Sequence, residues 1–157
     1  MPRQRPGRVR GFTLIELMTV IALMAVILGL GVPSLRDLIV SQRVKTAAFA
    51  FTGAAVQARS EAIKRNADVA LVAATGGWAN GWSIKQGATE LSRQSGHDGV
   101  LMASVAPKVT ATTITYQASG RLSAAVDELQ VSDANGGHAR CISFDLSGMP
   151  KSRAGGC

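Results

Sequence analysis

The chain has 157 residues, enough for one domain and an anchor, and its formal net charge is +7. Four of the 17 basic residues, and none of the 10 acidic ones, precede Gly11. The remainder has 13 basic against 10 acidic residues, or +3, so the high isoelectric point is no argument for nucleic-acid binding. Basic residues beside a spanning segment stay cytoplasmic, so we expect everything after Val32 to face the periplasm or the outside of the cell.

The first predicted element is an apolar transmembrane helix at residues 12–33. From Phe12 to Val32 there are 21 residues, with Glu16 as the only charge. A helix of that length reaches about 30 Å, which is enough to cross the hydrocarbon core of a bilayer. A conventional secretory signal is one alternative, but no small-x-small cleavage site ends the run. An uncut signal anchor is another, and it leaves Gly11, Phe12 and Glu16 without a role.

The junction Arg10-Gly-Phe-Thr-Leu-Ile-Glu16 resembles the class III signal of type IV prepilins and type II secretion pseudopilins. The resemblance implies that residues 1–11 are a leader, which prepilin peptidase cuts between Gly11 and Phe12 before methylating the Phe12 amine. It also implies that Glu16 pairs with the terminal amine of a neighbouring subunit during assembly. A carboxylate in hydrocarbon costs roughly 2.5–3.5 kcal/mol, so a partner for Glu16 is physically reasonable.

Gly29, Gly31 and Pro33 are predicted to interrupt this helix. Pro33 cannot donate a hydrogen bond to the carbonyl of Gly29, and its ring crowds that turn. Type IV pilins carry a proline at this distance from the cut, in a region that can loosen when subunits pack. The resemblance makes Pro33 a candidate assembly residue, and a simple kink at the membrane exit is the alternative.

Residues 34–66 are predicted to form the amphipathic half of the same helix. Pairs of apolar residues recur every seven positions: Ala48 and Phe49, Ala55 and Val56, Ala62 and Ile63. This spacing places them on one face of a helix, which we interpret as the core face. Lys64 and Arg65 suit the negative end of the helix dipole, and Asn66 can adopt a left-handed cap.

Residues 67–157 are predicted to form a β-rich globular part. Strands are expected at residues 69–73, 113–116 and 141–146, the last with Ile142, Phe144 and Leu146 on one face. The segment from Trp78 to Trp82 is expected to form a turn between strands. The predicted fold is α+β, with a long N-terminal helix packed on an antiparallel sheet.

Three segments look like the GspH/FimT family of minor pilins and pseudopilins: residues 58–66, Gly81-Trp82 and residues 116–122. The resemblance implies a type IV pilin-like fold. It also implies the partners, which are other pilins or pseudopilins, prepilin peptidase and the inner-membrane assembly platform. The chain would then be a structural subunit, and a separate assembly motor would hydrolyse any ATP.

The two cysteines, Cys141 and Cys157, are predicted to form a disulfide in an oxidising compartment, with two unpaired thiols as the alternative. Neither His97 nor His138 stands in a metal-ligand spacing with them. The glycines form no nucleotide-binding pattern, and the serines lack a nucleophile-elbow context. We therefore expect no enzyme activity, no metal and no cofactor.

DNA binding is a more specific hypothesis. FimT-like minor pilins that serve DNA uptake resemble this chain, and some carry a Gly-Arg-x-Arg motif near the C-terminus. Here Met149 and Lys151 replace the two arginines of that motif. Lys151, Arg153 and Arg140 remain as candidates for contacts with phosphates, which are sequence-independent and salt-sensitive. A solvated tail fixed by the disulfide is the alternative.

Three functions follow from the sequence. The first is a minor pilin that primes or caps a type IV pilus. The second is a minor pseudopilin of type II protein secretion. The third is a DNA-binding minor pilin for transformation.

Overall fold

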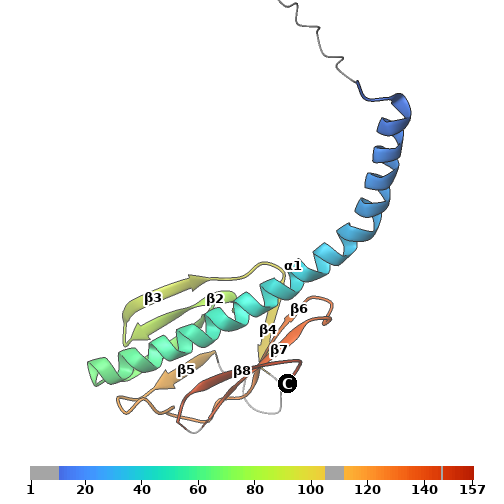
Figure 1. Ribbon diagram of the computed structural model, residues 1–157. Helices are drawn as coiled ribbons and strands as arrows, with labels where there is room; N and C mark the ends of the chain where they lie inside the picture. Colours follow the sequence, from blue (N-terminus) through green and yellow to red (C-terminus); the bar gives the residue numbers. More distant parts are fainter. Residues whose placement is uncertain (1–10, 105–111, 146) are drawn as a thin grey trace, which may run out of the picture. The chain divides into compact units, whose positions relative to one another are not determined.

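The computed structural model describes residues 11–104, 112–145 and 147–157, and it leaves out the side chains of residues 30–33 and 104. The chain divides into two compact units, Met1–Leu38 and Ile39–Cys157, and each is described by itself. One long helix, α1 (Leu14–Arg65), is followed by a series of strands (Figure 1). The strands are β1 (Val69–Ala74), β2 (Gly77–Gln86), β3 (Thr89–Ser95), β4 (Val100–Ser104), β5 (Thr113–Tyr116), β6 (Leu129–Asp133), β7 (Ala139–Phe144) and β8 (Pro150–Ala154).

Helix α1 begins and ends with recognisable caps. At its start the backbone N–H of Glu16 donates to the hydroxyl of Thr13 at 3.3 Å, which satisfies one of the unpaired N–H groups of the first turn. At its end Asn66 has a φ of 49°, the left-handed conformation predicted for it. The N–H groups of Asn66 and Ala67 donate to the carbonyls of Ile63 and Ala62, which is the hydrogen-bond pattern of a Schellman motif.

The prediction that both halves belong to one helix is confirmed, and Gly29, Gly31 and Pro33 do not end it. Helix α1 runs from Leu14 to Arg65 without a break, through Gly29 and Pro33. A proline removes one hydrogen bond of the ladder, and the bonds on either side hold the helix together. A kink at Pro33 that matters for assembly stays a prediction.

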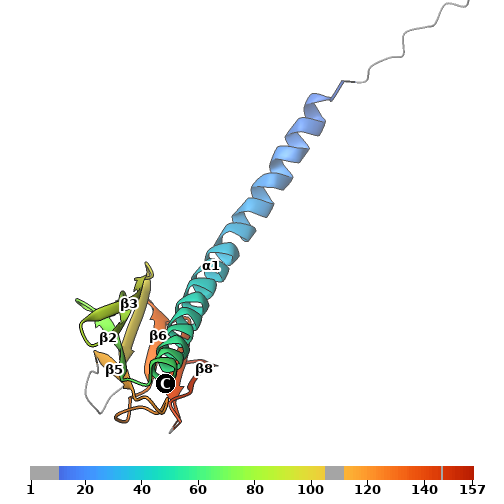
Figure 2. The ribbon, with the colours of Figure 1, turned by 90° about the vertical axis from the view of Figure 1, so that its left-hand side faces the viewer.

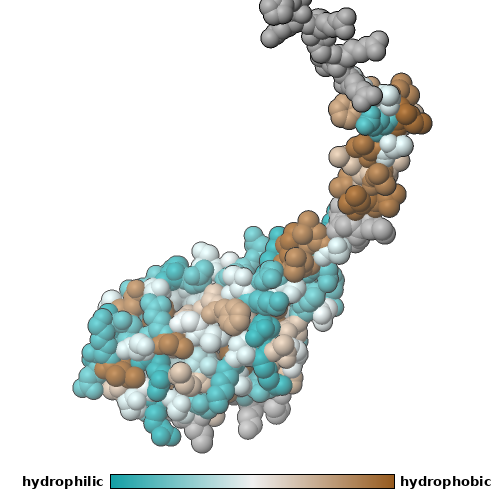
Figure 3. Space-filling view, viewed as in Figure 1, coloured by the Kyte–Doolittle hydropathy of each residue, from teal (hydrophilic) through white to brown (hydrophobic). Residues whose placement is uncertain are grey.

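The N-terminal stretch of α1 is apolar on all sides. It is long and apolar enough to cross a membrane, and none of that stretch is buried inside the protein. Figure 3 shows hydrophobic residues along this stretch and a mixed surface on the Ile39–Cys157 unit. A helix that is hydrophobic all round needs an apolar environment, which fits a membrane anchor.

Two antiparallel sheets follow the helix. The first has the strand order β3-β2-β1-β5, and the second has the order β4-β6-β7-β8. The C-terminal half of α1 lies against both sheets, as the views in Figures 1 and 2 agree. The predicted α+β class and the strand at residues 113–116 are confirmed.

The core is built by alanines of the helix and large side chains of the sheets. The ring of Phe51 meets those of Trp78 and Trp82 edge-on, at centroid distances of 5.1 and 5.3 Å. Small alanine side chains allow the helix backbone to approach the sheets closely, and those at positions 47, 48, 55, 58 and 62 are fully buried. The predicted core face is correct for Ala48, Ala55 and Ala62. It is wrong for their neighbours Phe49, Val56 and Ile63, whose side chains are exposed.

The predicted turn between Trp78 and Trp82 is also wrong. Both residues lie within β2, and the chain reverses before it, where β1 and β2 pair through Ala74 and Gly77. Residues four apart in a strand face the same way, so both indoles point into the core and reach Phe51.

Strand β7 ends at Phe144, earlier than the predicted strand, and Leu146 lies outside the described residues. The predicted alternation is incomplete, because Cys141 and Ile142 are both fully buried. Ile142 packs in the core, whereas Cys141 is bonded to Cys157 on the other face of the strand.

Candidate functional site

The residues at the predicted cleavage site are accessible. Gly11 and Phe12 lie before the first turn of α1, and 83% of the Phe12 surface is exposed. Gly11, Phe12, Thr13 and Glu16 line one shallow hollow. An exposed, non-helical junction is the form in which a peptidase can bind a chain, so the local geometry suits the predicted cut.

Glu16 also stands at a helix-capping position, where its backbone N–H donates to the hydroxyl of Thr13. Thr13 and Glu16 occupy the N-cap and third positions of α1, the spacing of a capping box. The signal in the sequence is the spacing Thr-x-x-Glu just before an apolar run. A test of Glu16 must therefore separate its charge from its contribution to the helix start.

The predicted disulfide joins Cys141 to Cys157, sixteen residues apart. Cys141 is fully buried in β7, and the backbone N–H of Cys157 donates to the side-chain oxygen of Gln130 on β6 at 3.2 Å. The bond therefore attaches the segment after β8 to the second sheet. Glu128 lies beside the two sulfur atoms, but sulfur atoms bonded to each other do not offer the thiolates that a metal site requires.

Loss of the disulfide is expected to destabilise the fold by about 3 kcal/mol, because a bond that closes a loop of this length restricts the unfolded chain. The comparison is urea unfolding of the full chain in detergent micelles, for the wild type and for Cys157→Ala. Reductant should lower the midpoint of the wild type to that of the variant and leave the variant unchanged. A wild-type midpoint that does not respond to reductant would contradict the prediction.

The three candidate DNA contacts do not form one cluster. Strand β8 is an edge strand, and Lys151 and Arg153 lie two residues apart on one of its faces. Arg140 lies on the other face, where its Nε donates to the Ser152 hydroxyl at 3.0 Å and its guanidinium stands 5.0 Å from the Phe49 ring centre. The structure thus brings Lys151 and Arg153 together and separates Arg140 from them.

Both remaining cations have acidic neighbours. Lys151 Nζ lies 3.5 Å from Asp145, and Arg153 Nη2 lies 3.5 Å from Glu128. Hydrogen bonds from the Ser147 hydroxyl and from the backbone N–H of Met149 lower the pKa of Asp145 to about 2. Asp145 is therefore charged at neutral pH, and it offsets part of the positive potential of the strand.

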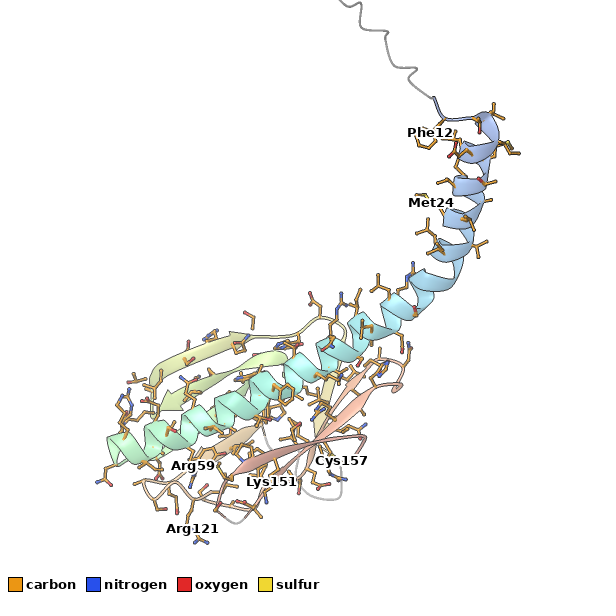
Figure 4. The ribbon with its side chains drawn as sticks, viewed as in Figure 1. Phe12, Met24, Arg59, Arg121, Lys151 and Cys157 are labelled. Carbon is orange, nitrogen blue, oxygen red and sulfur yellow. A yellow bond between two sulfur atoms is a disulfide. The ribbon has the colours of Figure 1, made fainter. Side chains whose placement is uncertain are left out.

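Two of the segments that resemble the GspH/FimT family, residues 58–66 and 116–122, contact each other, which was not predicted. Arg59 Nε, on α1, donates to the carbonyl of Gly120 at 2.9 Å, and the Tyr116 hydroxyl donates to the carbonyl of Gly148 at 3.1 Å. Burial raises the pKa of Tyr116 to about 12, so the hydroxyl keeps its proton. The first bond holds the loop at Gly120 against the helix, and the second attaches the loop before β8 to β5. Figure 4 shows Arg59 on α1 and Arg121 projecting from this region.

Glycine suits position 120 because its φ is +76°, a conformation that L side chains rarely adopt. A Cβ atom there would also displace the end of the half-exposed Ile63 side chain. His97 lies in the loop between β3 and β4 and stacks on Trp82, with 6.0 Å between ring centres. Both contacts position loops, and neither forms a catalytic arrangement.

The family model described as type II transport protein GspH matches residues 47–148, about two thirds of the chain. The chain belongs to the GspH family. A second model, the prokaryotic N-terminal methylation motif, matches residues 7–32 and so includes the predicted cleavage site and Glu16. No curated protein matches the chain significantly by sequence.

Solved structures share the GspH-family fold. The type IV minor pilin FimU of Pseudomonas aeruginosa is 21% identical, with a TM-score of 0.61 over 71% of this chain and 96% of that one. A second crystal form of FimU gives 20% identity and a TM-score of 0.62 over 73% and 93% of the two chains. The minor pseudopilin EpsH of Vibrio cholerae is 11% identical, with a TM-score of 0.56 over 71% and 97%. The predicted type IV pilin-like fold is confirmed.

Proposed function

We propose that this chain is a minor pilin of a type IV pilus, processed by prepilin peptidase and incorporated during filament assembly or initiation. The observation that carries the proposal is the methylation motif at residues 7–32, which precedes an exposed apolar helix with a single early carboxylate, Glu16. In this account the mature subunit is anchored in the inner membrane before assembly, with its Ile39–Cys157 unit in the periplasm. Its partners are other pilins and the assembly platform.

The proposed cut between Gly11 and Phe12 predicts the effect of one substitution. Gly11→Leu should leave the chain unprocessed, and intact-mass measurement of the membrane fraction should find residues 1–11 still attached. Among the described residues beyond its chain neighbours, no atom lies within 4 Å of the position that a Cβ of Gly11 would occupy, so a block in processing would reflect the peptidase and not a clash with that part of the chain.

The matched control is Gly7→Leu, which changes a glycine elsewhere in the leader. This variant should mature to the mass of a chain that starts at Phe12 and carries one added methyl group. A Gly11→Leu chain that matures to that same mass would place the cleavage site elsewhere.

A minor pseudopilin of type II secretion is the second candidate, and the match to the type II transport protein GspH family favours it. The fold is found in both kinds of subunit. Preference for the pilus rests on the C-terminal disulfide, an arrangement common among pilins. Deletion of the gene distinguishes the two: loss of exoprotein export with pili intact would identify a pseudopilin, and loss of pili with export intact would identify a pilin.

DNA binding is the third candidate, because Lys151 and Arg153 lie side by side on an exposed edge strand. Fluorescence anisotropy with a short DNA duplex should show weak, salt-sensitive binding by the full chain in detergent. Lys151→Ala combined with Arg153→Ala should reduce the slope of log affinity against log salt by about 2, one for each lost phosphate contact.

The control for this measurement is Lys64→Ala combined with Arg65→Ala. These two exposed cations lie in the last turn of α1 and pair with Glu61. Equal weakening by both pairs would indicate unspecific attraction to positive charge. No binding by the wild type at low salt would remove this candidate.

A further inference from the structure

The first sheet carries a polar groove on the face that α1 does not cover. Leu71, Trp82 and Ile84 point to the core on one face, and alternation along the strands places their neighbours on the other. The groove has a volume of about 480 Å³, within the range of sites for small ligands. Its polar lining includes Thr75, Asn80, Ser83, Lys85, Arg93 and Ser95.

A bulge in β3 places an acidic and a basic side chain on the same face of the strand, beside this groove. In the pairing of β2 with β3, Ile84 faces Ser92 and Lys85 faces Glu90, so Leu91 is an extra residue. The bulge brings Glu90 and Arg93 to the same face, although they are three residues apart. There they form two hydrogen bonds, of 2.9 and 2.6 Å.

Three donors line the groove from neighbouring positions on one face of β2 and β3. Ser83 faces Arg93 directly across the strand pair, and Lys85 follows Ser83 on the same face of β2. Positions two apart in a strand are separated by about 7 Å, so one ligand group can contact all three side chains. With Glu90 as the neighbouring acid, two positive charges and one negative charge leave this region with a net charge of +1.

Ser83 is the most buried member of the set. The residue is more than nine-tenths buried, and no hydrogen bond of its hydroxyl is found within the described part of the chain. The hydroxyl is not one of the fully enclosed polar atoms, so it keeps some contact with solvent in the groove that Ser83 lines. A ligand bound there can accept a hydrogen bond from it.

We propose that this groove binds an oxyanion, the phosphate or carboxylate group of a small polar ligand, through Ser83, Lys85 and Arg93. The lysine and the remaining guanidinium donors attract the negative charge, and the serine hydroxyl donates a hydrogen bond to an oxygen. Asn80 and Ser95 at the rim suit hydroxyl groups of the same ligand. This site is separate from the filament role, which depends on the N-terminal segment.

Nuclear magnetic resonance of the isotope-labelled full chain in detergent micelles tests the proposal. Sodium phosphate and sodium glucuronate are the two probes, and glucose is the uncharged control. Amide signals of Ser83, Lys85 and Arg93 should shift saturably, with a dissociation constant on the order of a few millimolar for a solvent-screened site. A response to phosphate alone identifies a phosphate ligand, and a response to glucuronate alone identifies a carboxylate.

Matched variants locate the binding. Lys85→Met should weaken it about tenfold, as expected for a charged hydrogen bond, whereas Lys64→Met on the helix should leave it unchanged. Ser83→Ala should weaken it about fivefold, while Ser92→Ala, on the other face of the sheet, should have no effect. The spectra of the variants also report whether each one folds.

Three results would overturn the proposal. The first is the absence of saturable shifts up to about 50 mM, where a millimolar site is filled. The second is an equal response to glucose, which would mean that charge is not recognised. The third is unchanged affinity in a folded Lys85→Met variant.

Discussion

Glu16→Ala is expected to reduce incorporation of the subunit into filaments at least about tenfold. A charged carboxylate in hydrocarbon costs roughly 2.5–3.5 kcal/mol, and its pairing with the amine of a neighbouring Phe12 offsets part of that cost in one register only. Because Glu16 is exposed and lies outside the Ile39–Cys157 unit, that unit should keep its unfolding midpoint. The measurement is an immunoblot of sheared filaments relative to total cell protein.

Glu16→Gln separates the two roles of this residue. Glutamine suits the third position of a capping box as well as glutamate, but it carries no charge. If pairing drives assembly, the glutamine variant should be depleted from filaments as strongly as the alanine variant. Normal incorporation of the glutamine variant would mean that helix capping, and not charge pairing, explains the effect of Glu16→Ala.

Phe51→Ala is expected to destabilise the Ile39–Cys157 unit by about 3–5 kcal/mol, the cost of removing a large core side chain and leaving a cavity. Phe51 is fully buried, and its ring contacts the indoles of both Trp78 and Trp82. Because the two indoles are held in their own strands, they cannot close the cavity that the substitution leaves. A loss of this size approaches the entire stability of many domains. Urea unfolding followed by tryptophan fluorescence measures it directly.

Phe49→Ala is the matched control, since Phe49 lies two residues away and 57% of its surface is exposed. Its loss should cost no more than about 1 kcal/mol, mostly from the contact with Arg140. Similar destabilisation by both substitutions would mean that the helix buries a different face from the one described.

Local signals in the sequence were sufficient for the ends of the helix and for its apolar N-terminal stretch, because each depends on neighbouring residues alone. The leader and the cut between Gly11 and Phe12 stay predictions. Asn66 was predictable as a cap for the same reason, because its left-handed conformation needs no tertiary contact. The disulfide followed from compartment chemistry, which also acts independently of the fold.

Features that depend on tertiary contacts were not predictable. A seven-residue repeat identifies a helix face, but the sheets select the narrow alanine side of it, and Phe49, Val56 and Ile63 stay exposed. The segment from Trp78 to Trp82 contains turn-forming residues, yet burial of two indoles against Phe51 keeps it in a strand. The groove around Ser83 depends on a bulge and on cross-strand pairing, and neither leaves a clear signal in one sequence.

Mass spectrometry of filaments sheared from the cell surface tests the central claim most directly. The account predicts a methylated species that begins at Phe12, present in small amounts beside an abundant pilin. A processed chain that is found only in the cell envelope would contradict assignment to the pilus and favour the secretion pseudopilus. A chain that still carries residues 1–11 would contradict the account from its first step.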